Sequence, residues 1–162
     1  MGLDIYFYER HWLEPQKNKR GNLVKPSFSI PTQMYGKGRK RFEHVSYITC
    51  KVGYFRKANA IHKYFLDKCS CSDSFDDVNG RDLFPSVADI LELKEICLQL
   101  LGLTGKKFKE MAKELLPTAE GFFWGSLEYD RWYRRDLREF VKMVNKLHLD
   151  DPNVTVIYNA DW

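Results

Sequence analysis

The chain has 162 residues, of which 44% are hydrophobic and 15% aromatic, a composition typical of a folded protein and unlike that of a disordered chain. Its length predicts a single domain that buries about 68–70% of the unfolded surface and so needs no disulfide or metal for stability. The net charge of +4 is too small to indicate nucleic acid as the partner by itself.

The four cysteines are expected to be reduced thiols of a cytosolic protein. Cys69 and Cys71 have no second Cys or His pair nearby at zinc-ligand spacing, so neither a metal nor a cofactor is expected. The first residues lack the basic and then apolar pattern of a secretory leader. No segment approaches the ~18 apolar residues of a membrane span.

The N-terminal segment, residues 3–8, alternates aliphatic or phenylalanine side chains with Asp4 and two tyrosines, which predicts a strand. Residues 15–42 hold eight Lys and Arg residues and no acid, together with three prolines and three glycines. This composition predicts a basic arm that is a long loop or a loose hairpin. We expect a solvated arm, and contact with nucleic acid is the alternative.

Residues 45–52 are rich in β-branched and aromatic side chains and predict a strand that Gly53 ends. A helix is predicted over residues 55–68, with one apolar arc formed by Phe55, Ala58, Ile61, His62, Phe65 and Leu66. His62 in this arc fits a buried core histidine and a site histidine equally well. Arg56 and Lys63 lie two turns apart, where they suit a polyphosphate or an ordinary charged face.

Residues 69–85 predict a loop with a turn at Asn79–Gly80. Ser86, with Asp89 three positions later, predicts the start of a helix that Gly102 stops. Thr104 predicts the start of a shorter helix that ends before Pro117.

The last helix is predicted over residues 127–148, with Ser126 as its cap. Asp130 falls on the apolar arc of this helix and is expected to need a partner, for which His62, Arg56 and Asn59 are candidates. Residues 154–158 predict a final strand. The expected fold is α+β, with a mainly antiparallel sheet that contains both terminal strands and is covered by three or four helices.

Two segments, residues 53–63 and 121–130, together predict a site for an anionic ligand that carries a ring. A helix start at Ser126 favours an anion. Aromatic side chains at 122–124 suit stacking on a base, although such residues are more often part of the core. The expected ligand-binding residues are Arg56, Lys57, Asn59, His62, Lys63, Phe123, Trp124, Gly125, Ser126, Tyr129 and Asp130.

A catalytic set is not predicted. A pair of His62 with Cys97 or Ser126 is conceivable, but Ser126 does not lie in a nucleophile elbow.

The segments 1–6, 52–65, 115–118 and 121–126, together with Tyr129, Asp130 and Trp162, resemble a family of small tailed-bacteriophage proteins without a settled activity. The chain departs from the family pattern at Lys51, where a Glu is usual, and at Phe55 and Tyr64, where Trp is usual. The resemblance implies a phage product that acts in the cytoplasm of the host bacterium.

The function we expect is non-enzymatic binding of a nucleotide or cyclic nucleotide, which by analogy serves to sequester a host immune messenger and evade host defence. The alternative is a host-defence antagonist that binds a protein or nucleic acid through the basic arm. A small phosphate-ester hydrolase is the second alternative. A homo-oligomer with a shared pocket is compatible with each.

Overall fold

The computed structural model describes residues 2–32, 38–69, 78–121 and 123–162. Sequence features at Lys37, Cys71 and Phe122 therefore lie outside the described residues. The elements in chain order are β1 (Asp4–Trp12), β2 (Gln16–Lys17), β3 (Leu23–Val24), β4 (Phe28–Thr32), β5 (Gly38–Phe42), β6 (Tyr47–Arg56), α1 (Asn59–Cys69), β7 (Asp82–Leu83), α2 (Val87–Leu101), α3 (Gly105–Leu115), α4 (Arg131–Val144) and β8 (Val154–Asp161).

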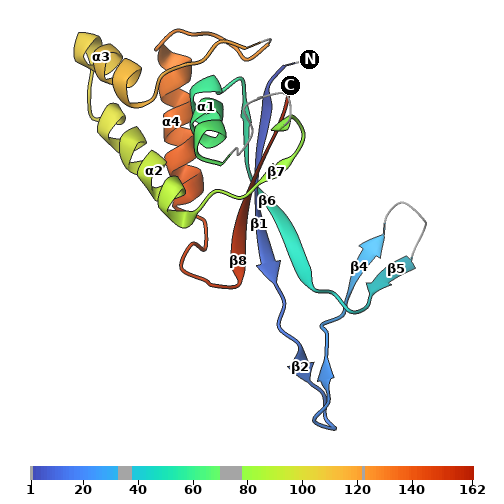
Figure 1. Cartoon of the computed structure of the whole chain (residues 1–162). Helices are drawn as coiled ribbons and strands as arrows, with labels where there is room; N and C mark the ends of the chain where they lie inside the picture. Colours follow the sequence, from blue (N-terminus) through green and yellow to red (C-terminus); the bar gives the residue numbers. More distant parts are fainter. Residues whose placement is uncertain (1, 33–37, 70–77, 122) are drawn as a thin grey trace.

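The main sheet has four antiparallel strands in the order β6-β1-β8-β7 (Figure 1). The two long terminal strands, β1 and β8, lie side by side in its centre. The predicted α+β fold with a mainly antiparallel sheet is confirmed, and both predicted terminal strands belong to it. The sequence did not predict β7, which forms part of the segment expected to be a loop.

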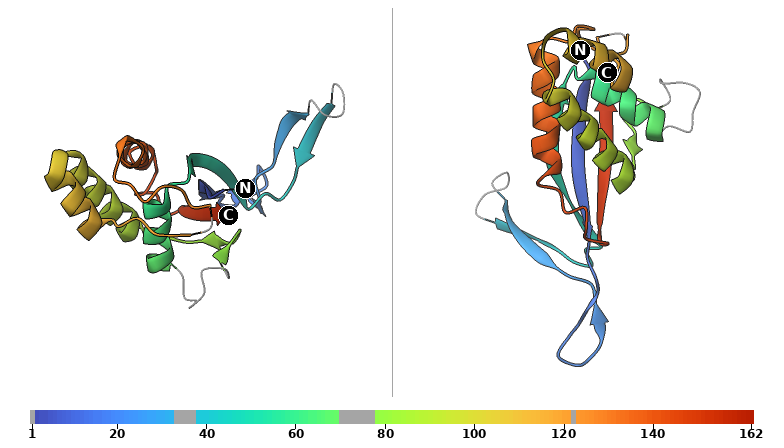
Figure 2. Two further views of the ribbon diagram at one scale, coloured as in Figure 1. Left: turned by 90° about the horizontal axis from the view of Figure 1, so that it is seen from above. Right: turned by 90° about the vertical axis from the view of Figure 1, so that its left-hand side faces the viewer.

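The four helices lie on one side of this sheet (Figure 2). The period-two pattern of β1 explains which face they cover, because Leu3, Ile5 and Phe7 are all 0% exposed on that face. Phe7 is the centre of the core, where its ring contacts the rings of Phe55, Phe65, Phe140 and Tyr158 edge to face. Tyrosines of β1 and β6 lie on the opposite, uncovered face.

Gly53 does not end its strand, contrary to the prediction. Strand β6 continues through Gly53 to Arg56 and stays paired with β1, with a register shift between Phe7 and Tyr8. A methyl group at Gly53 would lie 2.2 Å from the Sδ of Met143 in α4. The glycine therefore serves close packing of a helix on the strand and does not break the strand.

Helix α1 begins at Asn59, four residues after the predicted start. Phe55 and Arg56 still belong to β6. The chain turns between the two elements at Lys57, whose φ of 60° is left-handed. The predicted apolar arc is nevertheless buried, because Phe55 packs into the same core from the strand.

Helix α4 begins at Arg131, so the prediction that Ser126 caps a helix over 127–148 is wrong. The cap is Asp130, whose carboxylate accepts hydrogen bonds from the N–H groups of Trp132 and Tyr133. The hydroxyl of Ser126 instead accepts from the N–H of Glu128, two residues along, which makes a local turn.

The two middle helices begin where the sequence predicts. Ser86 and Asp89 form a reciprocal capping box at α2. Thr104 stands at the N-cap of α3 without a side-chain capping bond. The turn at Asn79–Gly80 is present, with Gly80 at a φ of 70°.

The basic segment forms two short hairpins, β2–β3 and β4–β5. Figure 1 shows them projecting from the end of the sheet that lies away from both termini. Each helix in the described ranges is too short or too polar to cross a lipid bilayer.

Candidate functional site

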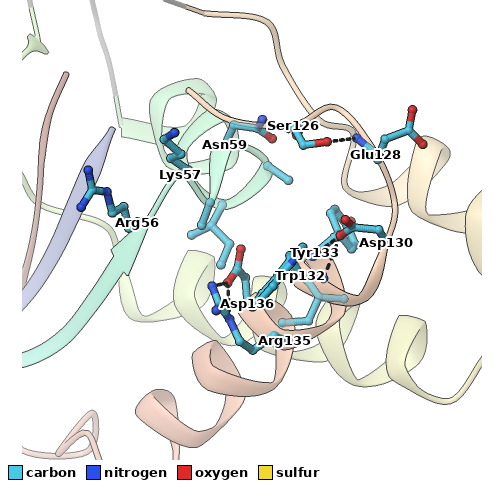
Figure 3. A pocket seen from close by; sticks show the side chains of 14 residues that line it. Arg56, Lys57, Asn59, Ser126, Glu128, Asp130, Trp132, Tyr133, Arg135 and Asp136 are labelled. Atoms are coloured by element: carbon cyan, nitrogen blue, oxygen red, sulfur yellow. Dashed lines mark hydrogen bonds and ion pairs between the residues drawn. The ribbon is translucent and has the colours of Figure 1, made fainter. Parts of the chain in front are cut away.

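A pocket of about 240 Å³ lies between the start of α1, the loop before α4 and the first two turns of α4 (Figure 3). Three segments form its wall: the β6–α1 junction, the 126–130 loop and one side of α4. The lining residues are Arg56, Lys57, Ala58, Asn59, Ala60, Ile61, Ser126, Glu128, Asp130, Trp132, Tyr133, Arg135, Asp136 and Leu137.

The β6–α1 junction is tied to the loop that passes over it. The N–H of Lys57 donates to the carbonyl of Leu3 over 2.8 Å, which fixes the left-handed turn against β1. The Asn59 side chain donates from Nδ2 to the carbonyl of Ser126 over 2.9 Å. Gly125 packs so closely that an added methyl would lie 2.8 Å from the Lys57 carbonyl oxygen. Both sides of the pocket are therefore held in one arrangement.

The opposite wall is the start of α4. The Asp130 carboxylate accepts from the N–H of Trp132 at 2.8 Å and of Tyr133 at 3.1 Å. Tyr133 donates from its hydroxyl to the carbonyl of Leu116 at 2.8 Å, which anchors this turn to the end of α3. The first turn of α4 is thus fixed from its cap and from its buried side.

Positive charge gathers at the start of α1. Arg56 and Lys57 precede this helix, and its first turn contains no acidic residue. The free N–H groups of a first helical turn carry partial positive charge, and they lie here behind the pocket wall formed by residues 58–61. The Arg56 guanidinium points away from the cavity in Figure 3, lies 4.0 Å from Asp4 and keeps 60% of its side chain exposed. The end of the Lys57 side chain lies with it beside Gly2, outside the lining. The N–H groups of the first turn are therefore the part of this wall that suits an anionic group such as a phosphate, with the two cations close by.

Trp132 supplies an aromatic surface across the pocket. Its side chain is 50% exposed, an unusual position for the largest apolar residue. The guanidinium groups of Arg131 and Arg135 each lie 4.7 Å from the centre of its ring system. A planar ligand ring can pack against this indole and the adjacent guanidinium planes.

Asp136 is a half-buried acid at the foot of the pocket, and Figure 3 shows it paired with Arg135. The Nη2 of Arg135 lies 3.1 Å from its Oδ1. Burial raises the pKa of Asp136 above its ordinary value, because the loss of hydration outweighs the lowering effect of Arg135. Such a carboxyl can take up a proton more readily than a solvated one and then donate a hydrogen bond.

Five of the expected ligand-binding residues line the pocket: Arg56, Lys57, Asn59, Ser126 and Asp130. The predicted partners of Asp130 are wrong, since its carboxylate caps its own helix and, among the described residues, no hydrogen bond or ion pair joins it to His62, Arg56 or Asn59. The binding role of these five residues stays a prediction.

His62 lies in the core and not in the pocket. Its side chain is 0% exposed, its Nδ1 shares a hydrogen bond with the hydroxyl of Tyr158, and its ring packs 4.5 Å from Trp124 and 4.7 Å from Trp162. Burial lowers the pKa of His62 to about 3, which keeps the ring neutral at physiological pH. The core interpretation of this residue fits the structure.

The other expected site residues also lie outside the lining. Trp124 is 5% exposed and packed against the His62 ring, and Phe123 and Gly125 belong to the loop behind the pocket. Lys63 pairs with Asp67 at 2.6 Å. The Tyr129 hydroxyl accepts from the N–H of Thr118.

Sequence reasoning missed all five lining residues on α4, of which Trp132, Arg135 and Asp136 carry the aromatic and charged groups. These three are spaced i, i+3 and i+4 and share one face of the helix. With Asp130 recognised as the cap of α4, these residues would have been placed in the first two turns of the helix, beside the pocket. Cys97, a conceivable nucleophile from the sequence, is 0% exposed. Burial raises the pKa of its thiol to about 12, which suits an inert core thiol.

Comparisons of the chain with protein-family models, with curated proteins and with solved structures find no match. The geometry of the pocket is therefore the basis for a functional proposal.

Proposed function

We propose that this protein binds a nucleotide or cyclic nucleotide in the pocket without converting it. The observation that carries the proposal is the pairing of the start of α1, whose first turn holds no acid, with an exposed tryptophan across one cavity. Phosphate binds at the N–H groups of the first turn of α1, and the nearby positive charges of Arg56 and Lys57 favour it there. The base packs on Trp132, with Asp136 in reach of its polar edge.

Binding without turnover fits the composition of the lining. Among the described residues that form the pocket there is neither a histidine nor a cysteine. Ser126 therefore has no histidine base beside it, and no Cys–His pair is present in the lining. The residues that are present can position a ligand through N–H groups and an aromatic surface.

The resemblance to tailed-phage proteins supports a phage setting for this binder in the cytoplasm of the host. In that setting, tight binding without turnover sequesters a host nucleotide messenger. The unusual Lys51 does not argue against this ligand class, because it lies over the Tyr6 ring at 5.7 Å and outside the pocket lining.

Calorimetric titration with mono-, di- and cyclic nucleotides tests the proposal. Trp132→Ala should weaken binding of the preferred nucleotide by about 5- to 150-fold, the equivalent of ~1–3 kcal/mol for lost stacking on one base. Trp12→Ala is the matched control, since Trp12 is 45% exposed and lies in β1 outside the pocket lining. Lys57→Asn should also weaken binding, because Asn tolerates the left-handed turn but lacks the charge.

Chromatography of the nucleotide recovered after incubation gives the second readout. Unchanged nucleotide supports a binder, and converted nucleotide supports a phosphate-ester hydrolase. Equal affinity for Trp132→Ala and wild type, or no nucleotide binding at all, would refute the proposal.

A second candidate function is binding of single-stranded nucleic acid, favoured by the uncovered face of the sheet. Tyr54 packs on Tyr6 at 5.3 Å, and Arg10 lies 4.6 Å from the ring of Tyr47. Alternating aromatic and cationic groups of this kind suit stacked bases and phosphates. The face leads into the basic arm (Figure 1).

Fluorescence anisotropy of a labelled single-stranded oligonucleotide at several salt concentrations tests this second function. Binding should weaken steeply as salt rises, and neutralising Arg39, Lys40 and Arg41 together should reduce the salt slope by about 2. Binding that is independent of salt and of these substitutions would contradict it.

A further inference from the structure

Glu9 is a buried carboxylate at the other end of β1 from the pocket. The same alternation that places Leu3, Ile5 and Phe7 in the core places Glu9 on the covered face, where it is 3% exposed. A buried carboxylate lowers stability by several kcal/mol unless hydrogen bonds and a positive charge compensate for its lost hydration. The groups around Glu9 therefore decide its role.

Two histidines surround this carboxylate. Its Oε1 accepts the N–H of His148 over 2.6 Å. Its Oε2 lies 3.2 Å from Nδ1 of His148 and 3.3 Å from Nε2 of His11. Within the described part of the chain, no Lys or Arg nitrogen is recorded within 4.0 Å of Glu9, so its possible charged partners are the two imidazoles or a bound cation.

The spacing of the three donor atoms suits a tetrahedral metal ion. Zinc takes His nitrogen and carboxylate oxygen at about 2.0–2.2 Å, which places neighbouring donors about 3.3–3.6 Å apart at the tetrahedral angle. The two separations from Oε2, 3.2 and 3.3 Å, lie close to this range, and all three donor atoms lie within 4.8 Å of one another. Rotation of the exposed His148 side chain can bring its nitrogen into the tetrahedral arrangement.

The backbone around the cluster also supports metal binding. Glu9 and His11 are two apart on one central strand, so both side chains leave the same face of a fixed backbone. The hydrogen bond from the His148 N–H orients the carboxylate and leaves Oε2 for a ligand role. The His148 side chain is 65% exposed, which gives an ion a path from solvent.

We propose that Glu9, His11 and His148 bind a divalent transition metal, with zinc as the probe. The bound ion supplies the missing positive charge beside Glu9 and joins β1 to the segment after α4. Three protein ligands leave the fourth tetrahedral position to water or to a small anionic ligand. This site is independent of the proposed nucleotide pocket.

Metal-stripped full-length protein titrated with zinc against a chromogenic chelator tests the proposal. Wild type should bind one zinc ion per chain with high affinity, and His148→Ala should bind it at least tenfold more weakly. His148 is exposed and lies outside the helices and strands, so this variant should fold. His44→Asn is the matched control, because His44 is an exposed histidine at a φ of 56° that Asn accepts, and its affinity should equal that of wild type.

Two further measurements separate this site from zinc held elsewhere. Zinc should raise the Tm of wild type and of His44→Asn but not of His148→Ala. Cobalt(II) in place of zinc should give visible absorption without a thiolate charge-transfer band, since no cysteine is a ligand. Zinc bound equally by wild type, His148→Ala and Glu9→Gln, or a thiolate band with cobalt, would overturn the proposal. So would the absence of zinc binding by wild type, because hydrogen bonds alone then hold the cluster.

Discussion

The loop behind the pocket makes a sharp test of the fold at Gly125. This residue has a φ of 111°, a region that side chains rarely enter. A methyl group there would lie 2.8 Å from both Cβ and the carbonyl oxygen of Lys57. Gly125→Ala should therefore destabilise the protein in two ways, through its own backbone and through the turn that precedes α1.

The magnitude follows from the two contributions. Left-handed backbone in a residue with a side chain costs about 1–2 kcal/mol. Crowding of a well-packed position costs about 1–3 kcal/mol more, and the crowded atom here is backbone that cannot rotate away. Gly125→Ala should lose roughly 2–5 kcal/mol of unfolding free energy.

Gly80 provides the control that separates these contributions. Its φ of 70° is also left-handed, but an added methyl would meet no described atom within 4 Å. Gly80→Ala should therefore lose only about 1–2 kcal/mol. Urea unfolding followed by circular dichroism measures the unfolding free energy of both variants, with the same dependence on urea concentration expected for each. Equal losses in the two variants would refute the close contact between Gly125 and Lys57.

Three further substitutions test the cap, the core histidine and the α2–α3 connection by the same unfolding measurement. Asp130→Ala should lose about 1 kcal/mol of unfolding free energy, because it removes two capping hydrogen bonds. Ser126→Ala should stay within about 0.5 kcal/mol of wild type. The reverse order would indicate Ser126 as the cap. Burial lowers the pKa of His62 in the folded protein to about 3, so on acidification the unfolded chain takes up the proton first. The unfolding free energy should therefore be full above about pH 6.5 and fall by roughly 2 kcal/mol by pH 5. His62→Gln should lack this fall, and a variant with the same pH dependence as wild type would contradict the buried neutral histidine. Arg134 donates to the carbonyl of Leu101, the last residue of α2, at 3.0 Å and to that of Leu103, just after the helix, at 2.8 Å. Arg134→Ala should therefore lose about 1.5–3 kcal/mol of unfolding free energy, while Arg138→Ala, at an exposed position, should stay within about 0.5 kcal/mol of wild type. Equal effects would argue against those bonds.

Local sequence patterns predicted the elements that depend on local physics. The alternation in β1 identified its covered face, and the Ser86–Asp89 pair identified the start of α2, because both signals are complete within a few residues. The apolar arc around His62 was also correct as a list of buried residues. It was assigned to one helix although Phe55 reaches the same core from a strand.

Two errors had tertiary causes. Gly53 resembles a strand breaker in isolation, but the space beside it is filled by Met143, ninety residues later in the chain. Ser126 and Asp130 are both good capping residues. Only the closure of the 126–130 loop onto Asn59 shows which of them starts the helix.

The two predicted segments do meet at one pocket, although only five of the eleven predicted residues line it, and ligand binding there stays a prediction. The aromatic residue on the pocket wall is Trp132, while Trp124 packs on His62. A stretch of aromatic residues beside glycines does not reveal which ring faces solvent, since that depends on the φ angles of the loop.

The cluster proposed to bind a metal could not be found by ligand spacing, since His148 lies far along the chain from His11. Antiparallel pairing brings them together: β8 returns beside β1, and the segment that leads into β8 passes the buried carboxylate. Asp4, which contacts Arg56 at the pocket end of β1, is five residues from Glu9, a separation of roughly 16 Å along a strand. Strand β1 is hydrogen-bonded to β6 and β8 between Asp4 and Glu9. The proposed nucleotide and metal sites therefore lie at opposite ends of one rigid strand and have no binding residue in common. His148→Ala should consequently leave the nucleotide affinity unchanged, and Lys57→Asn should leave the zinc affinity unchanged. A variant that changes both affinities would require a movement of β1, which its hydrogen bonds to β6 and β8 oppose.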